Sequence, residues 1–163
     1  WGVIHGIQVF IPRMLAGGDE GHIVNTASVA GLIAGAGNAS YTASKAGVVG
    51  MSEILYHELA AAGGRIGISV LCPALTNTAI IEADRNRPGG PGEKPAPGTP
   101  EHAMWEGVKA YFKTGMAPAT VADIVVDAIK AKRFYILTHP EHNERYRLRA
   151  EAMIAGGPPP LIA

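Results

Sequence analysis

Two residues that could transfer a proton, Tyr41 and Lys45, lie four positions apart at the start of a long apolar segment. Residues at this spacing share one face of an α-helix, so the phenol and the ammonium group would point the same way. A cation within about 4–6 Å favours the ionised form of a tyrosine, which lets the phenol exchange a proton with a substrate near neutral pH. The pair therefore predicts acid/base catalysis, although the same spacing is also common on helices that do no chemistry.

The segments around this pair predict an α/β fold. Residues 22–27, 65–71 and 134–138 are short and rich in β-branched or aromatic side chains, which is typical of buried strands. Helices are predicted over residues 1–16, 41–62, 100–113, 120–132 and 139–155, the fourth opening with a capping box at Thr120 and Asp123. Residues 29–40 predict a loop, and the proline- and glycine-rich segment 74–99 predicts a mobile connection. Strand, helix and strand of these lengths form a βαβ unit with parallel strands.

Three candidate site residues are predicted to meet at one edge of this sheet. Ser28 ends the first strand, Pro73 follows the second, and Tyr41 begins the helix between them. Ligands of open α/β sheets bind beyond the carboxyl ends of the strands, so these residues can converge on one crevice. There Ser28 could donate a hydrogen bond to a carbonyl oxygen while Tyr41 delivers the proton. Lys45 could favour the phenolate and bind a ribose hydroxyl.

The segment 22–45 resembles the short-chain dehydrogenase/reductase family. The resemblance rests on the strand that ends in Ser28, on the spacing of thirteen positions between Ser28 and Tyr41, and on the YxxxK pattern of Tyr41 and Lys45. Further along, residues 72–78 (CPALTNT) resemble the family's proline-glycine turn, with Ala74 where glycine is usual. The resemblance extends over nearly all of the chain.

This resemblance implies an oxidoreductase that transfers a hydride between NAD or NADP and a ketone or secondary alcohol. Its catalytic residues would be Ser28, Tyr41 and Lys45. Its cofactor-binding residues would be Tyr41, Lys45, Pro73, Leu75, Thr76 and Thr78, the last three along the nicotinamide carboxamide. The implied fold is the C-terminal part of a doubly wound, Rossmann-type parallel sheet. We expect one partial domain over residues 1–163, with a substrate lid at about residues 78–113.

The family's glycine-rich phosphate turn has no counterpart in this sequence, so we expect that the N-terminal, nucleotide-binding half is missing. The chain would then be a fragment that is inactive alone, and its first strand would be exposed along one edge. An alternative interpretation is a non-catalytic remnant that acts as an oligomerisation or interaction module. The helices at residues 1–16 and 41–62, which usually build the subunit interface in this family, would carry that role.

The composition limits the partners. The chain of 163 residues is 47% hydrophobic and 17% charged, and its 14 basic residues balance its 14 acidic ones. A neutral globular chain of this kind is not expected to bind nucleic acid or a membrane. The single cysteine, Cys72, is expected to pack at a strand end and suits a reducing cytoplasm. The family resemblance implies a homodimer or homotetramer, and the apolar residues between 80 and 116 favour a hydrophobic carbonyl or alcohol substrate.

A second cluster of polar residues lies at the start of the last predicted helix. His139 and His142 flank Pro140 and Glu141, which could suggest part of a metal site. The remaining ligands of a tetrahedral site are not evident, so we expect these histidines to cap a helix and expect no metal.

Overall fold

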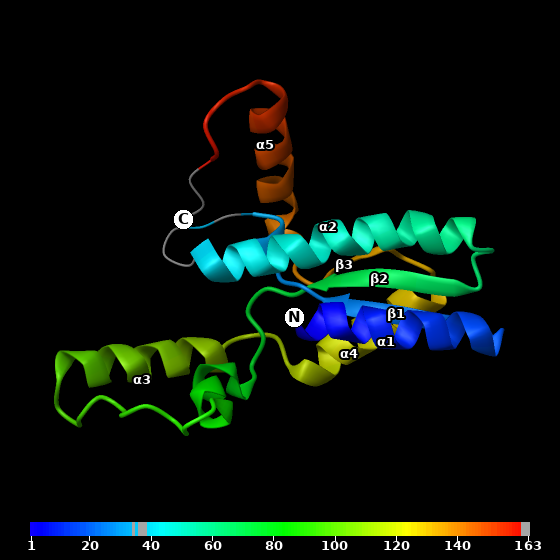
Figure 1. Cartoon of the computed structure of the whole chain (residues 1–163). Helices are drawn as coiled ribbons and strands as arrows, with labels where there is room; N and C mark the ends of the chain where they lie inside the picture. The colour runs from blue at the N-terminus through cyan, green and yellow to red at the C-terminus, as the bar shows by residue number, and fades with distance from the viewer. Residues whose placement is uncertain (34, 36–38, 161–163) are drawn as a thin grey trace. The chain divides into compact units, whose positions relative to one another are not determined.

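The computed structural model describes residues 1–33, 35 and 39–160 (Figure 1). These residues form two compact units, one of Trp1–Ala74 with Asp123–Ala163 and the other of Leu75–Ala122. Of the loop predicted over residues 29–40, positions 34 and 36–38 lie outside the described residues. Among the helices that the structure describes, none has the length and apolar character needed to span a membrane.

The first unit contains a parallel sheet of three strands. Strands β1 (Gly21–Thr26), β2 (Ile66–Cys72) and β3 (Tyr135–Leu137) lie in the order β1-β2-β3. Both strand pairs are parallel, with Thr26 opposite Leu71 and Cys72 opposite Leu137. The predicted fold class is therefore confirmed, since three parallel strands are flanked by helices. Within the described residues β1 lies at one edge of the sheet, as expected.

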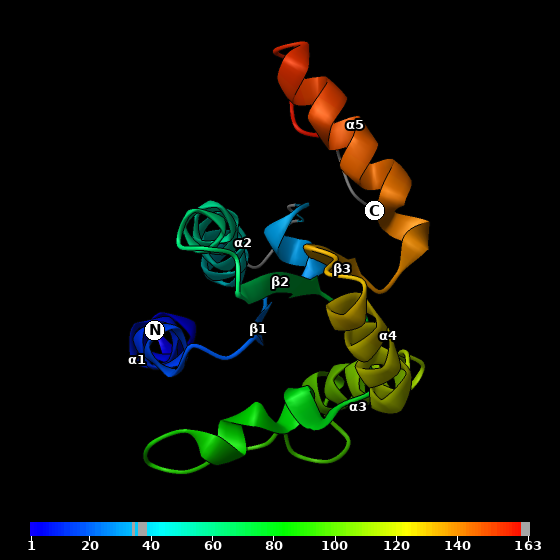
Figure 2. The ribbon, with the colours of Figure 1, turned by 90° about the vertical axis from the view of Figure 1, so that its right-hand side faces the viewer.

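Helices α1 (Gly2–Gly17) and α2 (Ala39–Ala61) lie on one side of the strands in Figure 2. Leu59 of α2 packs with Ile66 and Ile68 of β2, and side chains of α1 extend this cluster. Val49 of α2 packs with the more C-terminal part of the same strand. Strand β2 is buried along almost its whole length because its neighbours cover it on both edges and α2 covers a face.

A buried polar contact links α2 to β1. The Asn25 amide donates to the Ser52 hydroxyl at 3.0 Å, and that hydroxyl donates to the Val48 carbonyl at 2.7 Å. Both side chains are buried, so their hydrogen bonds offset the cost of removing polar groups from water. At the other edge of the sheet, the Tyr135 hydroxyl of β3 donates to Glu53 of α2 at 2.6 Å. These contacts hold α2 over all three strands.

The remaining elements correct several sequence-based boundaries. Helix α4 (Pro118–Lys130) begins at a proline, whose fixed φ suits a first helical turn, so the capping box predicted at Thr120 is wrong because Thr120 lies inside the helix. The connection predicted over residues 74–99 contains a 3-10 helix, η2 (Ala79–Asn86). Helix α3 (Pro100–Lys113) has the predicted bounds. The last predicted helix is divided into a 3-10 turn, η3 (Pro140–His142), and α5 (Asn143–Ile154).

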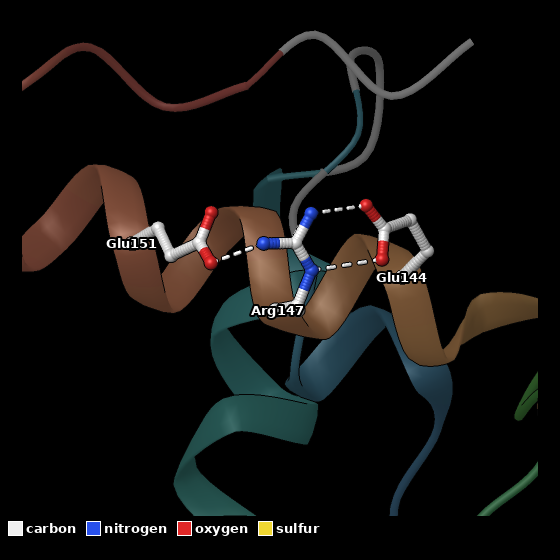
Figure 3. Close-up of polar contacts among 3 residues, drawn as sticks. All are labelled: Glu144, Arg147 and Glu151. Carbon is white, nitrogen blue, oxygen red and sulfur yellow. Dashed lines mark hydrogen bonds and ion pairs between the residues drawn. The ribbon is translucent and has the colours of Figure 1, made fainter.

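Helix α5 is stabilised largely by contacts along its own surface. Arg147 lies between two carboxylates, binding Glu144 one turn before it and Glu151 one turn after it (Figure 3). Its Nε donates to Glu144 Oε2 at 2.9 Å. Such pairs at intervals of three and four residues support a helix whose outer surface faces water.

A hydrogen-bonded chain of side chains crosses from β1 to the start of β3. His22 Nε2 lies 2.7 Å from the Ser69 hydroxyl, which donates to the Arg133 carbonyl at 2.7 Å. Because Ser69 gives its hydrogen to Arg133, we assign the ring hydrogen of His22 to Nε2. The ring also fills the space above Gly67, where an added Cβ would lie 2.4 Å from Nδ1. Burial, and then the positive charge of Lys132, lower the pKa of His22, so the folded protein holds this ring neutral.

We expect the free energy of unfolding to decrease as the pH falls below the ordinary histidine pKa of about 6.5. Above that pH the stabilisation from neutral His22 is complete, whereas below it the unfolded chain binds a proton that the folded protein resists. His142, whose pKa is also lowered, contributes to the same slope. Denaturant unfolding between about pH 7 and pH 5 should therefore show that the unfolding free energy changes less with pH for His22→Gln than for the wild type. Equal slopes of unfolding free energy against pH would contradict a neutral, partly buried His22.

Candidate active site

Tyr41 and Lys45 share one face of α2, as their spacing predicts. The Lys45 ammonium lies 5.7 Å from the centre of the Tyr41 ring. Both side chains are half-buried. The helix begins at Ala39, two residues before Tyr41, so the pair occupies its first two turns. The helix spacing thus places the cation close to the phenol.

A second contact connects Lys45 to the end of β1. Its ammonium group donates to the carbonyl oxygen of Thr26, the last residue of that strand, at 3.2 Å. An ammonium group carries three hydrogens, and this carbonyl accepts one of them. Lys45 therefore places a positive charge at the carboxyl edge of the sheet while keeping donor capacity for a ligand.

Ser28 lies where the β1–β2 ladder continues beyond the strands. Ala27 N–H donates to the Leu71 carbonyl at 2.8 Å, and Val29 N–H donates to the Pro73 carbonyl at 3.0 Å. The Ser28 hydroxyl accepts from Ala30 N–H at 3.2 Å and caps the 3-10 turn η1 (Val29–Gly31). It also donates to the Pro73 carbonyl at 3.4 Å, a long hydrogen bond that a better acceptor could replace. The structure thus brings Ser28 and Pro73 together, as predicted.

Cys72 supports this arrangement from within the core. It is buried, as expected, and burial raises the pKa of its thiol to about 11. A hydrogen bond from the Ser28 backbone and the charge of Lys45 act in the opposite direction but are outweighed. The thiol is therefore neutral at physiological pH and is a poor nucleophile. Its side chain packs in the core with Ala27, the residue before Ser28.

Gly31 has a positional role that the sequence did not reveal. A Cβ added there would lie 2.7 Å from the backbone oxygen of Lys45, a distance that real Cβ atoms do not tolerate. Only glycine lets η1 approach the backbone of α2 this closely. The turn that follows Ser28 is in this way set directly against the turn of α2 that carries Lys45.

Ala74 follows Pro73, where the resembled family usually has glycine. Outside glycine, Lys132 is the single residue with positive φ in the described ranges, so Ala74 fits its backbone without left-handed strain. Its N–H donates to Nδ1 of His139 at 3.3 Å. Sequence reasoning considered His139 as a helix cap or metal ligand and missed this contact. Within the described residues, no group of three His, Cys, Asp or Glu side chains could hold a metal ion.

The other predicted cofactor residues belong to the second unit. Leu75 accepts a hydrogen bond from Met116 N–H at 2.9 Å, and Thr76 pairs with Met116 in an isolated parallel bridge. Thr78 is exposed and precedes η2. Thr78 also lines a cavity of about 300 Å³ with Ile81, Phe112 and side chains of α3. Several apolar lid residues, including Met104 and Tyr111, are largely exposed.

A sequence profile described as short chain dehydrogenase matches residues 1–88. The chain belongs to the short-chain dehydrogenase family. It is 33% identical to the CLA biosynthesis dehydrogenase/reductase of Lactiplantibacillus plantarum, over 96% of this chain and 56% of that protein. It is 31% identical to the C alpha-dehydrogenase of a Sphingobium species, over 94% of this chain and 49% of the relative. The chain thus spans about half the length of the curated relatives that it matches.

A solved member of this family has the same arrangement. The crystal structure of a short-chain dehydrogenase/reductase from Burkholderia phymatum in complex with NAD is 41% identical in sequence, with a TM-score of 0.86. The match covers 99% of this chain and 59% of that structure. The parallel sheet and its helices are therefore those of a dehydrogenase of this family, extending over part of the length of the solved protein.

We expect Gly31→Ala to lower both stability and activity, because the new methyl group must push η1 away from α2. Overpacking of this kind costs about 1–3 kcal/mol of unfolding free energy. Denaturant unfolding and steady-state rates of the full-length protein would measure the two effects.

Gly107→Ala provides the matched control. A Cβ at this position in α3 meets no atom within 4 Å, so the change should stabilise the helix by about 0.5–1 kcal/mol. A Gly31→Ala protein as stable as the wild type would contradict the close packing of η1 on α2.

Proposed function

We propose that the full-length protein is an NAD- or NADP-dependent oxidoreductase that interconverts a ketone and a secondary alcohol. The observation that carries this proposal is the position of Lys45, whose ammonium lies 5.7 Å from the Tyr41 ring and 3.2 Å from the carbonyl at the end of β1. A cation held beside a phenol at the carboxyl edge of a parallel sheet suits proton exchange with a ligand in that crevice.

The residues at this edge fit a dinucleotide cofactor. The remaining hydrogens of the Lys45 ammonium can bind a ribose hydroxyl, and the Tyr41 hydroxyl can bind the same sugar. Pro73 follows β2 at the same edge, and we propose that Leu75, Thr76 and Thr78 line the nicotinamide carboxamide. When bound, the nicotinamide supplies or accepts the hydride. The Burkholderia phymatum relative is a complex with NAD, which supports this class of cofactor without choosing between NAD and NADP.

The protein side chains would supply the proton and orient the substrate. In the direction of reduction, Tyr41 transfers its hydroxyl proton to the carbonyl oxygen as a hydride adds to the carbonyl carbon. Ser28 donates a hydrogen bond to the same oxygen in place of its long bond to Pro73. Lys45 stabilises the phenolate that Tyr41 leaves behind. In oxidation the same residues act in reverse, and Tyr41 receives the proton.

The substrate is proposed to be a small hydrophobic carbonyl compound or alcohol. The cavity in the second unit is lined by apolar groups, including Ile81 and Phe112, together with polar and charged residues of both signs. Relatives of this chain include a 1-deoxy-11-beta-hydroxypentalenate dehydrogenase of Streptomyces avermitilis, which is 30% identical over 89% of the chain. Such a name supports a secondary alcohol on an apolar skeleton. We propose a cytoplasmic location because the one cysteine, Cys72, is a buried free thiol.

An interaction module is the alternative proposal, and exposed apolar side chains favour it. Phe10 on α1 and Ile54 on α2 are each about 60% exposed, and Val9 and Tyr56 are also largely accessible. Apolar groups on two helices of one unit are typical of a surface that a subunit covers. A catalytic homodimer or homotetramer would use the same surface, so the catalytic variants below distinguish the two proposals.

In the full-length protein, Tyr41→Phe should lower turnover by about 10²–10⁴-fold, because the phenyl ring carries no proton to transfer. Binding of NADH or NADPH, followed by fluorescence titration, should remain within a few-fold of the wild type. Tyr135→Phe is the matched control, since it removes a hydroxyl that binds Glu53 and lies outside the proposed site. Retained turnover in Tyr41→Phe would exclude Tyr41 as the acid. A wild type that binds neither cofactor would favour the interaction module.

Lys45→Met should weaken cofactor binding and reduce the rate together, because the ammonium group serves both the ribose and the phenol. Methionine keeps the length of the side chain but removes its charge, so the phenolate loses its neighbouring cation. The pH at which the rate of alcohol oxidation rises should therefore move upward. Initial rates across the pH range measure this shift, and an unchanged profile would count against the role of Lys45 in proton transfer.

A further inference from the structure

The turn that follows β2 is held from two sides. On the β1 side, the Pro73 carbonyl accepts hydrogen bonds from Val29 N–H at 3.0 Å and from the Ser28 hydroxyl at 3.4 Å. On the β3 side, Ala74 N–H donates to His139 Nδ1 at 3.3 Å. Both polar groups of the peptide between Pro73 and Ala74 are therefore hydrogen-bonded, the carbonyl to residues that follow β1 and the N–H to a residue that follows β3.

The His139 ring is well placed to act as a fixed acceptor. His139 is 9% exposed and Thr138 is 3% exposed. The Thr138 hydroxyl lies 2.7 Å from the same Nδ1. A backbone N–H can only donate, so Nδ1 must carry a lone pair and the ring hydrogen is on Nε2. The Thr138 hydroxyl and the Ala74 N–H then share the one lone pair of Nδ1, the hydroxyl at the shorter distance, and the hydroxyl restricts the rotation of the ring.

We propose that His139 is a positioning residue for cofactor binding: it fixes Ala74, and through Ala74 the turn that begins at Pro73. This inference rests on the proposed function, in which the turn lies against the nicotinamide. Where the resembled family usually has glycine, this chain has alanine without positive φ. The buried imidazole of His139 restrains the turn from the β3 side.

His142 lies beside His139 but has a different hydrogen-bond partner. The centre of the His142 ring lies 6.2 Å from that of His139, and its Nδ1 faces Arg145 at 3.4 Å. His142 therefore offers a histidine of similar location for comparison. Substituting it tests whether any disturbance of this corner of the fold has the same effect.

The test compares two amides at position 139 in the full-length protein. Asparagine places its Oδ1 close to the position of Nδ1 and retains an acceptor for Ala74, whereas glutamine extends one carbon further and does not. We expect His139→Gln to bind NADH or NADPH about five- to tenfold more weakly, the effect of losing one hydrogen bond, while His139→Asn stays within about twofold of the wild type. His142→Gln, the control, should also stay within about twofold.

The affinity for ADP-ribose separates general damage to the fold from loss of the turn. General damage would lower this affinity, whereas loss of the turn would not. ADP-ribose lacks the nicotinamide ring, so its affinity for His139→Gln should remain within about twofold of the wild type. Equal weakening of NADH and ADP-ribose, or equal behaviour of the Gln and Asn variants, would overturn the positioning role. Failure of the wild type to bind either cofactor would overturn the proposed function and this inference together. Normal catalysis by the wild type with unchanged binding by His139→Gln would overturn this inference alone.

A second measurement needs no variant. Hydrogen exchange of the Ala74 amide in the wild type should be slow, with protection similar to that of the Val29 amide, because both are bonded to buried acceptors. Exchange of Ala74 at the rate of an exposed amide would overturn the proposed contact even where the substituted proteins do not fold.

Discussion

The candidate site depends on a backbone ladder that continues past the ends of its strands. After Thr26 and Cys72 close β1 and β2, the hydrogen bonds from Ala27 to Leu71 and from Val29 to Pro73 carry the parallel pairing further. Parallel pairing sets which residues lie opposite each other, so Ser28 has no freedom to leave Pro73 without breaking these bonds. The serine hydroxyl is thus positioned by main-chain geometry before any side-chain contact contributes.

Burial keeps the thiol at this edge of the sheet uncharged. Lys45 brings a positive charge close to Cys72, and this charge acts to lower the pKa of the thiol. Removal of the thiol from water is the larger influence, and it raises the pKa of Cys72 to about 11. The sulfur therefore remains uncharged at physiological pH, and it does not form an ion pair with the Lys45 ammonium group.

Local sequence patterns predicted the parts of the site that depend on spacing, and they missed the parts that depend on contact across the chain. The interval between Tyr41 and Lys45 determines a shared helix face, and glycine-bounded β-branched segments indicated β1 and β2. Gly31 gave no such signal, because its role arises only when η1 meets the backbone of α2. His139 contacts Ala74 from a position 65 residues further along the chain, between β3 and η3, and its neighbours suggested a helix cap instead. The start of α4 was misjudged because Pro118 outweighs the side chain of Thr120.

The proposed chemistry depends on contacts from distant parts of the chain. Tyr41 and Lys45 lie on α2, and Lys45 also binds the carbonyl at the end of β1. The turn at Pro73 and Ala74 is bonded to Val29, which follows β1, and to His139, which follows β3. The last third of the sequence therefore supports both parts of the proposed site, since His139 binds the turn and Tyr135 binds α2 through Glu53.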